Sequence, residues 1–336
     1  MNNPITIKIL AKALNLSPGT ISKALKDSYE ISKETKEKVQ ALAKALNYVP
    51  NPYASSLRKK ISNTIAVVLP EVADSFFSQA INGIESIAQD KGYHVLIYLT
   101  HESLAREETI LEQFQSGRVD GILMSVSAET NHSEHIEKII ASGIPVVFFD
   151  RICENVETAC VTTDDLESGY KAACHLLEQG CKKIAFLSIS DKLAIINMRM
   201  EGFKKALKET DIKTGAVKIC SNNEAECAKT IKKLLMSKNR PDGIIASAEK
   251  LAAAVYTVSS EINLGIPADI KVIAFSNLQI ASLLNPPLST ITQPAFEIGS
   301  TAATLLFKSL EKSKFNLKDQ RIVIPSLLIK RASTVN

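Results

Sequence analysis

Short apolar runs alternate with amphipathic segments beyond Ile65, and this alternation constrains the fold more than any other feature of the sequence. The runs with the length and composition of strands are 65–69, 94–99, 121–124, 146–149, 184–188, 217–220, 243–246 and 272–275. Helical periodicity separates most of them. Such alternation predicts an α/β fold with parallel sheets and helices on both faces. About eight strands over roughly 270 residues indicate two lobes rather than one.

Two of the intervening segments show a clear apolar face. Residues 76–89 and 166–179 are the expected helices. Their predicted inward side chains are Phe77, Ala80, Ile81, Ile84, Ile87 and Ala88 in the first helix, and Tyr170, Ala173, Cys174 and Leu177 in the second.

The first 48 residues follow a different pattern, with helical periodicity and no strand signal. Thr6 can cap a first helix, and Ser17 followed by Pro18 is a strong start signal for a second. Ser32 can cap a third. The expected helices cover residues 7–14, 18–25 and 32–46. Two short helices, a brief turn and a supporting helix predict an all-α helix-turn-helix domain.

Pro50 and Pro52 prevent the third helix from continuing into the segment that follows it. We therefore predict a helix-turn-helix domain at 1–49, a linker at 50–62 and a two-lobed body at 63–336. The expected lobes are 63–162 with 293–322, and 163–292 with 323–336.

Charge is distributed unevenly between the two ends. The first 60 residues hold 11 Lys and Arg against 4 Asp and Glu, whereas the remainder holds 29 against 32. A basic head on a mildly acidic body indicates that a polyanion binds at one end. The alternative is that small polar domains are often rich in lysine.

Several classes of protein are disfavoured by what the sequence lacks. No two of the six cysteines have C-x-x-C spacing, which argues against zinc ribbons and thioredoxin-like redox motifs, so we expect reduced thiols. We find no signal-peptide core and no apolar run near the roughly 18 residues of a membrane helix. We therefore expect a cytoplasmic protein with no membrane partner.

Enzyme motifs are also missing. The sequence contains no G-x-G-x-x-G, no G-x-x-x-x-G-K-[ST] and no G-x-S-x-G, so we predict no enzymatic activity and no cofactor. His132 and His135, with Glu134 between them, have the spacing of a metal-ligand pair. No third ligand stands nearby in the sequence, so we predict surface histidines and no metal site.

Several segments, in order along nearly the whole chain, resemble the lactose-repressor (LacI-type) family of bacterial transcription regulators. They include Ser-Pro-Gly-Thr-Ile-Ser-Lys-Ala-Leu at 17–25 and Ile-Pro-Val-Val-Phe-Phe-Asp-Arg at 144–151. The others are 5–8, 47–52, 54–58, 74–77, 119–122, 199–202, 265–269 and 290–294. The resemblance implies a body like that of periplasmic sugar-binding proteins, with a ligand cleft between its lobes.

The resemblance also implies a recognition helix that begins at Ser17 and lies in the major groove, and a short hinge helix in the linker. The implied DNA-contacting residues are Thr6, Ser17, Pro18, Gly19, Thr20, Ser22, Lys23, Tyr29, Asn51, Ala54, Leu57 and Arg58. Lys23 can donate to guanine, and Leu57 would wedge between base pairs in the minor groove. The alternatives are a solvated surface for Lys23 and Tyr29, and packing against the body for Leu57. Ser55 stands where the family often has arginine.

The implied effector-binding residues are Phe76, Phe77, Ser125, Asp150, Arg199, Glu249, Ser276 and Gln293. Asp150 ends a predicted strand, where open α/β sheets bind ligands. The alternatives are a helix cap for Asp150, a surface ion pair for Arg199 and a core position for Phe77. Glu249 and Ser276 stand where many relatives have aspartate, which favours a ligand with fewer hydroxyls or an anion held by Arg199.

Together these features predict a homodimeric transcription regulator, expected to be a repressor, that binds a pseudo-palindromic operator. A small carbohydrate or sugar-acid effector would control its DNA affinity. A solute-binding protein of a transport system shares the body and is the alternative, and a sugar-modifying enzyme is the third possibility.

Overall fold

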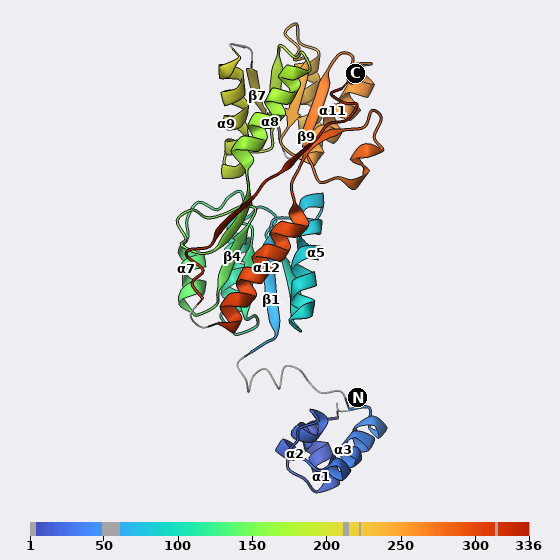
Figure 1. The fold of residues 1–336 in the computed structure, drawn as a ribbon, viewed down its shortest axis with the longest axis vertical. Helices are drawn as coiled ribbons and strands as arrows, with labels where there is room; N and C mark the ends of the chain where they lie inside the picture. The colour runs from blue at the N-terminus through green and yellow to red at the C-terminus, as the bar shows by residue number, and fades with distance from the viewer. Residues whose placement is uncertain (1–4, 49–60, 211–214, 222, 313–314, 336) are drawn as a thin grey trace. The chain divides into compact units, whose positions relative to one another are not determined.

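The computed structural model describes residues 5–48, 61–210, 215–221, 223–312 and 315–335. The chain divides into two compact units, Met1–Ser62 and Asn63–Asn336 (Figure 1). No helix within those described ranges is long and apolar enough to cross a membrane.

The first unit contains the helices α1 (Ile7–Leu14), α2 (Pro18–Leu25) and α3 (Lys33–Ala45), which confirms the predicted three-helix pattern. The Ser17 hydroxyl caps α2 by accepting a 3.0 Å hydrogen bond from the amide of Thr20. The Ser32 hydroxyl caps α3 in the same way. Thr6 precedes α1 but makes no side-chain cap, contrary to expectation. Leu10, Ile21, Ala24 and Val39 are fully buried between the helices.

The second unit is built on two six-stranded sheets. The N-terminal lobe has the order β11-β5-β4-β3-β1-β2, and its paired strands are all parallel. Its strands are β1 (Thr64–Leu69), β2 (His94–Leu99), β3 (Gly121–Met124), β4 (Val146–Phe149), β5 (Cys160–Thr163) and β11 (Arg321–Ile324).

The C-terminal lobe has the order β12-β10-β9-β8-β6-β7. Its strands are β6 (Ile184–Ser188), β7 (Gly215–Ile219), β8 (Gly243–Ala246), β9 (Lys271–Phe275), β10 (Ser289–Thr292) and β12 (Leu327–Ile329). Only β12 runs antiparallel, against β10. The chain passes from one sheet to the other after Thr163, after Thr292 and after Ile324.

All eight predicted strands are present, with ends within two residues of the prediction. The four strands that the sequence analysis missed are β5, β10, β11 and β12. Each has three or four residues, and β5 and β10 are rich in threonine and serine. These strands lie next to the points where the chain passes from one sheet to the other. Hydrogen bonds to a neighbouring strand define them, and they have no long apolar run that the sequence could reveal.

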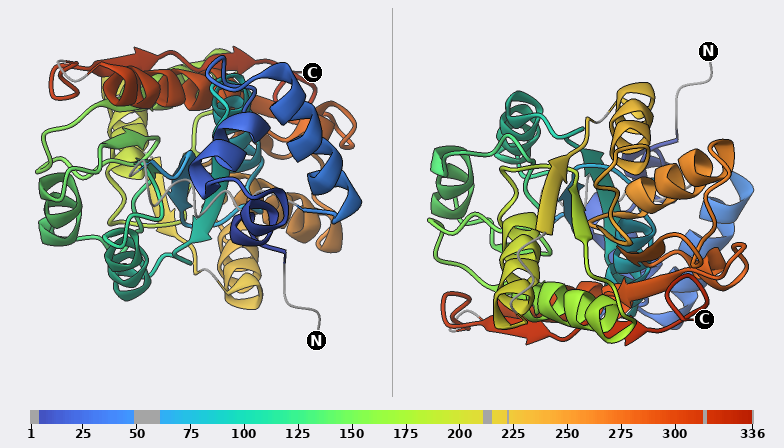
Figure 2. Two further views of the ribbon diagram at one scale, coloured as in Figure 1. Left: turned by 90° about the horizontal axis from the view of Figure 1, so that it is seen from below. Right: turned by 90° about the horizontal axis from the view of Figure 1, so that it is seen from above.

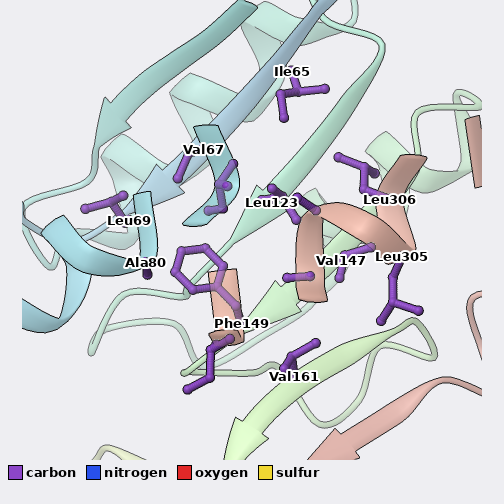
Figure 3. Close-up of a cluster of buried hydrophobic side chains, with 14 of the residues drawn as sticks. Ile65, Val67, Leu69, Ala80, Leu123, Val147, Phe149, Val161, Leu305 and Leu306 are labelled. Atoms are coloured by element: carbon purple, nitrogen blue, oxygen red, sulfur yellow. The ribbon is translucent and has the colours of Figure 1, made fainter. Parts of the chain in front are cut away.

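Helices cover both faces of the N-terminal sheet, as predicted (Figure 2). Helices α5 (Ser75–Asp90) and α12 (Ala295–Glu311) cover one face, and α6 (Leu104–Phe114) and α7 (Glu134–Ala141) cover the other. Alternate residues of β1 separate accordingly, with Val67 packed towards α5 and Val68 towards α6. Figure 3 shows the first of these cores, where Phe149 and Leu305 lie among aliphatic side chains.

The C-terminal sheet has the same arrangement. Helices α8 (Asp165–Glu178) and α9 (Ala194–Glu209) pack on one face, and α10 (Glu224–Leu235) and α11 (Glu249–Glu261) pack on the other. A 3₁₀ turn, η1 (Gln279–Ser282), follows β9.

The predicted apolar face of α8 needs a correction. Its buried residues are Asp165, Ser168, Gly169, Ala172, Ala173, His175 and Leu176. Of the predicted residues only Ala173 is fully buried, and Tyr170, Cys174 and Leu177 are partly buried at the edge of the same core. The reason is close packing of α8 on α9 through small residues. A Cβ atom on Gly169 would lie 2.0 Å from the backbone oxygen of Arg199, and one on Gly202 would lie 1.9 Å from that of Leu166.

Replacing Gly169 with alanine should therefore push α8 and α9 apart and destabilise the second unit by about 1–3 kcal/mol. Gly265→Ala is a matched control in the same lobe, because its added Cβ would meet only the Asp269 carboxylate, at 3.2 Å, and Ala268. Urea unfolding of both variants measures the difference. Equal stabilities would show that the helix contact is not tight.

Candidate functional site

A cleft between the two lobes holds two cavities of about 40 Å³ and about 530 Å³. Their walls come from the carboxyl ends of strands in both sheets and from the first turns of the helices that follow. Asp150, Arg151 and Ile195 line both cavities, so the cavities are neighbouring parts of one cleft.

The smaller cavity gathers seven of the eight predicted effector-binding residues: Phe76, Phe77, Asp150, Arg199, Glu249, Ser276 and Gln293. Ser125 does not line it, but its hydroxyl lies 3.5 Å from the carboxylate of Asp150. Phe76 and Phe77 are also core residues in edge-to-face contact, 5.4 Å between ring centroids. Phe77 is therefore a core residue, as the alternative predicted, and it also forms part of the cavity wall.

Asp150 is buried but has few partners. Besides Ser125, its carboxylate has only Arg151 Nε at 3.8 Å as a close polar neighbour among the described side chains. Burial raises the pKa of Asp150 to about 6, although the charges of Arg151 and Arg199 oppose that shift. Its backbone has φ of 61°, the strained left-handed region for a non-glycine residue. The strained backbone and the buried carboxylate both lower the stability of the folded state.

Arg199 projects from α9 and is buried, so the surface ion-pair alternative is wrong. Its Nε donates to Asp165 at 2.7 Å and its Nη1 donates to the backbone oxygen of Ser247 at 3.1 Å. The guanidinium also lies over the Phe275 ring, 4.2 Å from the centroid. Asp165 already neutralises this arginine, which weakens the expectation that Arg199 holds an anion.

Gln293 offers a free donor to the cavity. Its side-chain Nε2 is buried without a hydrogen-bond partner among the described residues. Its backbone is held from both sides by the Asn277 amide, through bonds of 2.6 Å and 3.2 Å. A buried amide without a partner costs roughly 1–3 kcal/mol, and a bound ligand can remove that cost.

Glu249 connects the two lobes. Its carboxylate accepts a 2.9 Å hydrogen bond from the Ser75 hydroxyl at the start of α5 and a 2.8 Å bond from the backbone amide of Asn277. The side chain of Gln79 adds a second link, with Nε2 donating to the Asn277 backbone oxygen at 2.9 Å and Oε1 accepting from Asn277 Nδ2 at 3.2 Å. Burial and the nearby Asp74 raise the pKa of Glu249. These contacts join the two lobes across the cleft.

The sequence analysis missed several residues of this site: Asp74, Ser75, Gln79, Arg151, Asp165, Ser247 and Asn277. Most of them follow a strand directly or begin a helix. The rule that ligands bind at the carboxyl ends of parallel strands could therefore have identified most of these residues from the sequence. Asp165 was hidden because β5, which precedes it, was not predicted.

In the first unit, α2 presents the predicted DNA-contacting face. Ser17, Pro18 and Lys23 are exposed, as are Thr6 before α1 and Tyr29, which is 94% exposed. Gly19, Thr20 and Ser22 are partly exposed. A Cβ atom on Gly19 would meet only the Ser17 hydroxyl, at 3.5 Å, so the fold does not need glycine there.

Two contacts within the protein involve the predicted DNA-contacting side chains of α2. The Ser17 and Thr20 hydroxyls pair with each other at 2.9 Å. Lys23 pairs with Glu30, an exposed ion pair worth at most about 1 kcal/mol, so a nucleic acid can displace it. The predicted contacts Asn51, Ala54, Leu57 and Arg58 lie outside the described residues.

Comparison with known families decides the class. Residues 6–51 match the family described as bacterial regulatory proteins, lacI family. Residues 62–332 match periplasmic binding proteins and sugar binding domain of LacI family. The chain belongs to the LacI family.

Individual relatives agree with this assignment. The ribose operon repressor of Halalkalibacterium halodurans is 31% identical over 98% of this chain and 97% of its own length. The lac repressor dimer bound to operator and the anti-inducer ONPF has a TM-score of 0.86, with 22% identity over 99% of this chain and 100% of that one. A LacI family transcriptional regulator from Enterococcus faecium with bound ribose has a TM-score of 0.73, with 28% identity over 81% of this chain and 98% of that one.

These findings confirm the predicted family, the fold class and the function of a DNA-binding transcription regulator. The match at residues 6–51 supports the regulator rather than the transport-protein alternative. The named relatives are transcription regulators.

Replacing Asp150 with asparagine should change how stability depends on pH. The folded-state pKa of about 6 lies above the ordinary value of 3.8, so the neutral carboxyl favours the folded state. This contribution to the free energy of unfolding is fully present below about pH 4, falls as the pH rises and is lost above about pH 6. We expect Asp150→Asn to be more stable than the wild-type chain at neutral pH, by at most on the order of 3 kcal/mol.

Urea unfolding of both proteins between about pH 4 and pH 8 measures this difference. Asparagine tolerates the left-handed backbone, so the variant isolates the carboxyl charge. A difference that stays constant across this range would contradict the assignment of the raised pKa to Asp150.

Proposed function

We propose that this chain is a homodimeric repressor whose affinity for a pseudo-palindromic operator is controlled by a neutral monosaccharide bound in the smaller cavity. The observation that carries the proposal is the pair of buried, incompletely bonded groups there: the Asp150 carboxylate and Gln293 Nε2. A carboxylate accepts from hydroxyl groups and an amide NH₂ donates to them. Together they complement the alternating donors and acceptors of a polyol.

Charge in the cleft favours a neutral sugar over a sugar acid. Asp74, Asp150 and Glu249 line the smaller cavity together with Arg151 and Arg199. Each arginine already contacts a carboxylate outside this set, Arg199 on Asp165 and Arg151 on Glu102. Little positive charge is left for an anion. Phe76 and Phe77 supply an apolar surface for one face of a sugar ring.

Ribose is the first ligand to test. A relative 31% identical is named a ribose operon repressor, and a solved regulator 28% identical holds ribose. The smaller cavity, of about 40 Å³, does not hold a whole pentose, so a bound sugar would extend into the neighbouring cavity of about 530 Å³ or would need the lobes to move apart.

We infer that ligand binding changes the distance between the two linkers of a dimer by altering the contacts between lobes. Opening the cleft would break the bonds of Glu249 to Ser75 and of Gln79 to Asn277. A coupling of about 1–3 kcal/mol is enough for an allosteric response.

Calorimetric titration of the full chain with D-ribose tests the sugar site. Gln293→Ala and Asp150→Asn should each weaken binding by about tenfold or more, since each removes a hydrogen bond to a buried group. Gln115→Ala changes an exposed glutamine outside the cleft and is the matched control. In the wild type, affinity should rise as the pH increases through about 6, because the ionised Asp150 is the better acceptor.

Two results would contradict this assignment. One is an affinity for D-ribose that is the same in Gln293→Ala and Asp150→Asn as in the control variant Gln115→Ala. The other is tighter binding of ribose phosphate or a sugar acid than of neutral sugars. That result would support the earlier expectation that Arg199 binds an anionic ligand.

The linker prediction is tested on a duplex selected from a random library by the purified chain. We propose that Leu57 wedges between base pairs, so Leu57→Ala should reduce both the bending and the affinity of the selected duplex. Calorimetry should find sugar binding unchanged. Unaltered bending, measured by energy transfer between dyes at the duplex ends, would argue that Leu57 packs on the protein instead.

A further inference from the structure

Three side chains with metal-binding chemistry meet on the N-terminal lobe, on the face of the sheet covered by α6 and α7. They are Glu108 of α6, His132 just before α7, and His135 in its first turn. One nitrogen of each histidine and one oxygen of the carboxylate lie within 4.8 Å of one another. His132 Nε2 is 3.5 Å from Glu108, and the two imidazole rings are 5.3 Å apart between centroids.

A buried carboxylate engages one nitrogen of His135. The Nε2 atom lies 2.9 Å from the Glu107 carboxylate, which is fully buried and also accepts bonds from Ser127 and Thr130. This contact holds the imidazole ring in place and leaves Nδ1 as its other polar atom.

The Nδ1 atom of His135 has no hydrogen-bond partner among the described residues, although the side chain is only 7% exposed. A buried polar atom without a partner is unfavourable unless something else contacts it. Glu108 and His132 are both partly exposed, so an ion can reach the group from solvent.

We propose that Glu108, His132 and His135 bind a divalent transition-metal ion of the Zn²⁺ type. Two imidazoles and one carboxylate are a donor set that suits Zn²⁺ and leaves a fourth position open to water. Mg²⁺ and Ca²⁺ prefer oxygen ligands and do not fit two nitrogen donors. Glu107 is a positioning residue, because a carboxylate bonded to the far nitrogen of a histidine orients the ring towards the metal.

The prediction of surface histidines is wrong for His135, which is buried where α7 packs on the sheet, whereas His132 is partly exposed. The sequence analysis found the two histidines but no third ligand, because Glu108 lies on another helix and far away in sequence. Packing of α6 beside α7 supplies it. The inference does not depend on the proposed sugar site.

Isothermal titration of the chelator-treated full chain with ZnCl₂ tests the proposal. We expect one ion per chain, and no binding of Mg²⁺ under the same conditions. His132→Ala and Glu108→Gln should each weaken Zn²⁺ binding by at least about tenfold. Both side chains are partly exposed, so the metal-free variants should unfold at the same temperature as the wild type. His94→Ala, an exposed histidine on β2, is the matched control and should bind as the wild type does.

Glu107→Gln tests the positioning role, and should weaken Zn²⁺ binding by about 10–100-fold while leaving the three ligands in place. Titration with Co²⁺ adds a spectroscopic check, since a thiolate ligand would give an intense near-ultraviolet charge-transfer band. We expect no such band. Its appearance would assign the ion to a cysteine and overturn the proposal, as would affinities that are equal in the wild type, His132→Ala and Glu108→Gln.

Discussion

The chain crosses between two parallel sheets three times, and the rest of the cleft depends on that constraint. After Thr163, Thr292 and Ile324 the backbone leaves one sheet and enters the other. Because of these crossings, the carboxyl ends of the strands in both sheets face the same cleft. Side chains that follow strands in different lobes therefore lie close together there. Asp150 and Gln293, far apart in sequence, line one small cavity for this reason.

The site also shows how binding and stability oppose each other in one molecule. Asp150 combines a left-handed backbone, a buried carboxylate and few protein partners. Each of these features lowers the stability of the folded state. Asp165 and Arg199, by contrast, pair with each other in the walls of the two cavities and join α8 to α9. The rigid pair supports the position of the groups that remain available to a ligand.

Much of this arrangement could be predicted from local sequence. The long strands, the serine caps of α2 and α3, and seven of the eight cavity residues followed from periodicity, capping chemistry and family resemblance. What failed was set by distant contacts. Strands β5 and β10 carry threonine and serine and are defined by their neighbours, and the tight approach of Gly169 to α9 shifted the buried face of α8. Glu108 beside His132 needed the packing of two helices.

The hydrogen bonds from Glu249 to Ser75 and from Gln79 to Asn277 join the lobes through protein groups alone. This arrangement of the lobes therefore has stability of its own, and the proposed sugar ligand would have to compete with it or select among existing populations. The apparent affinity of the regulator is then the intrinsic affinity multiplied by the fraction of molecules able to admit the ligand. Substitutions at Ser75 or Gln79, which contribute to these contacts between the lobes, would in this way change the concentration of the proposed ligand at which the regulator responds.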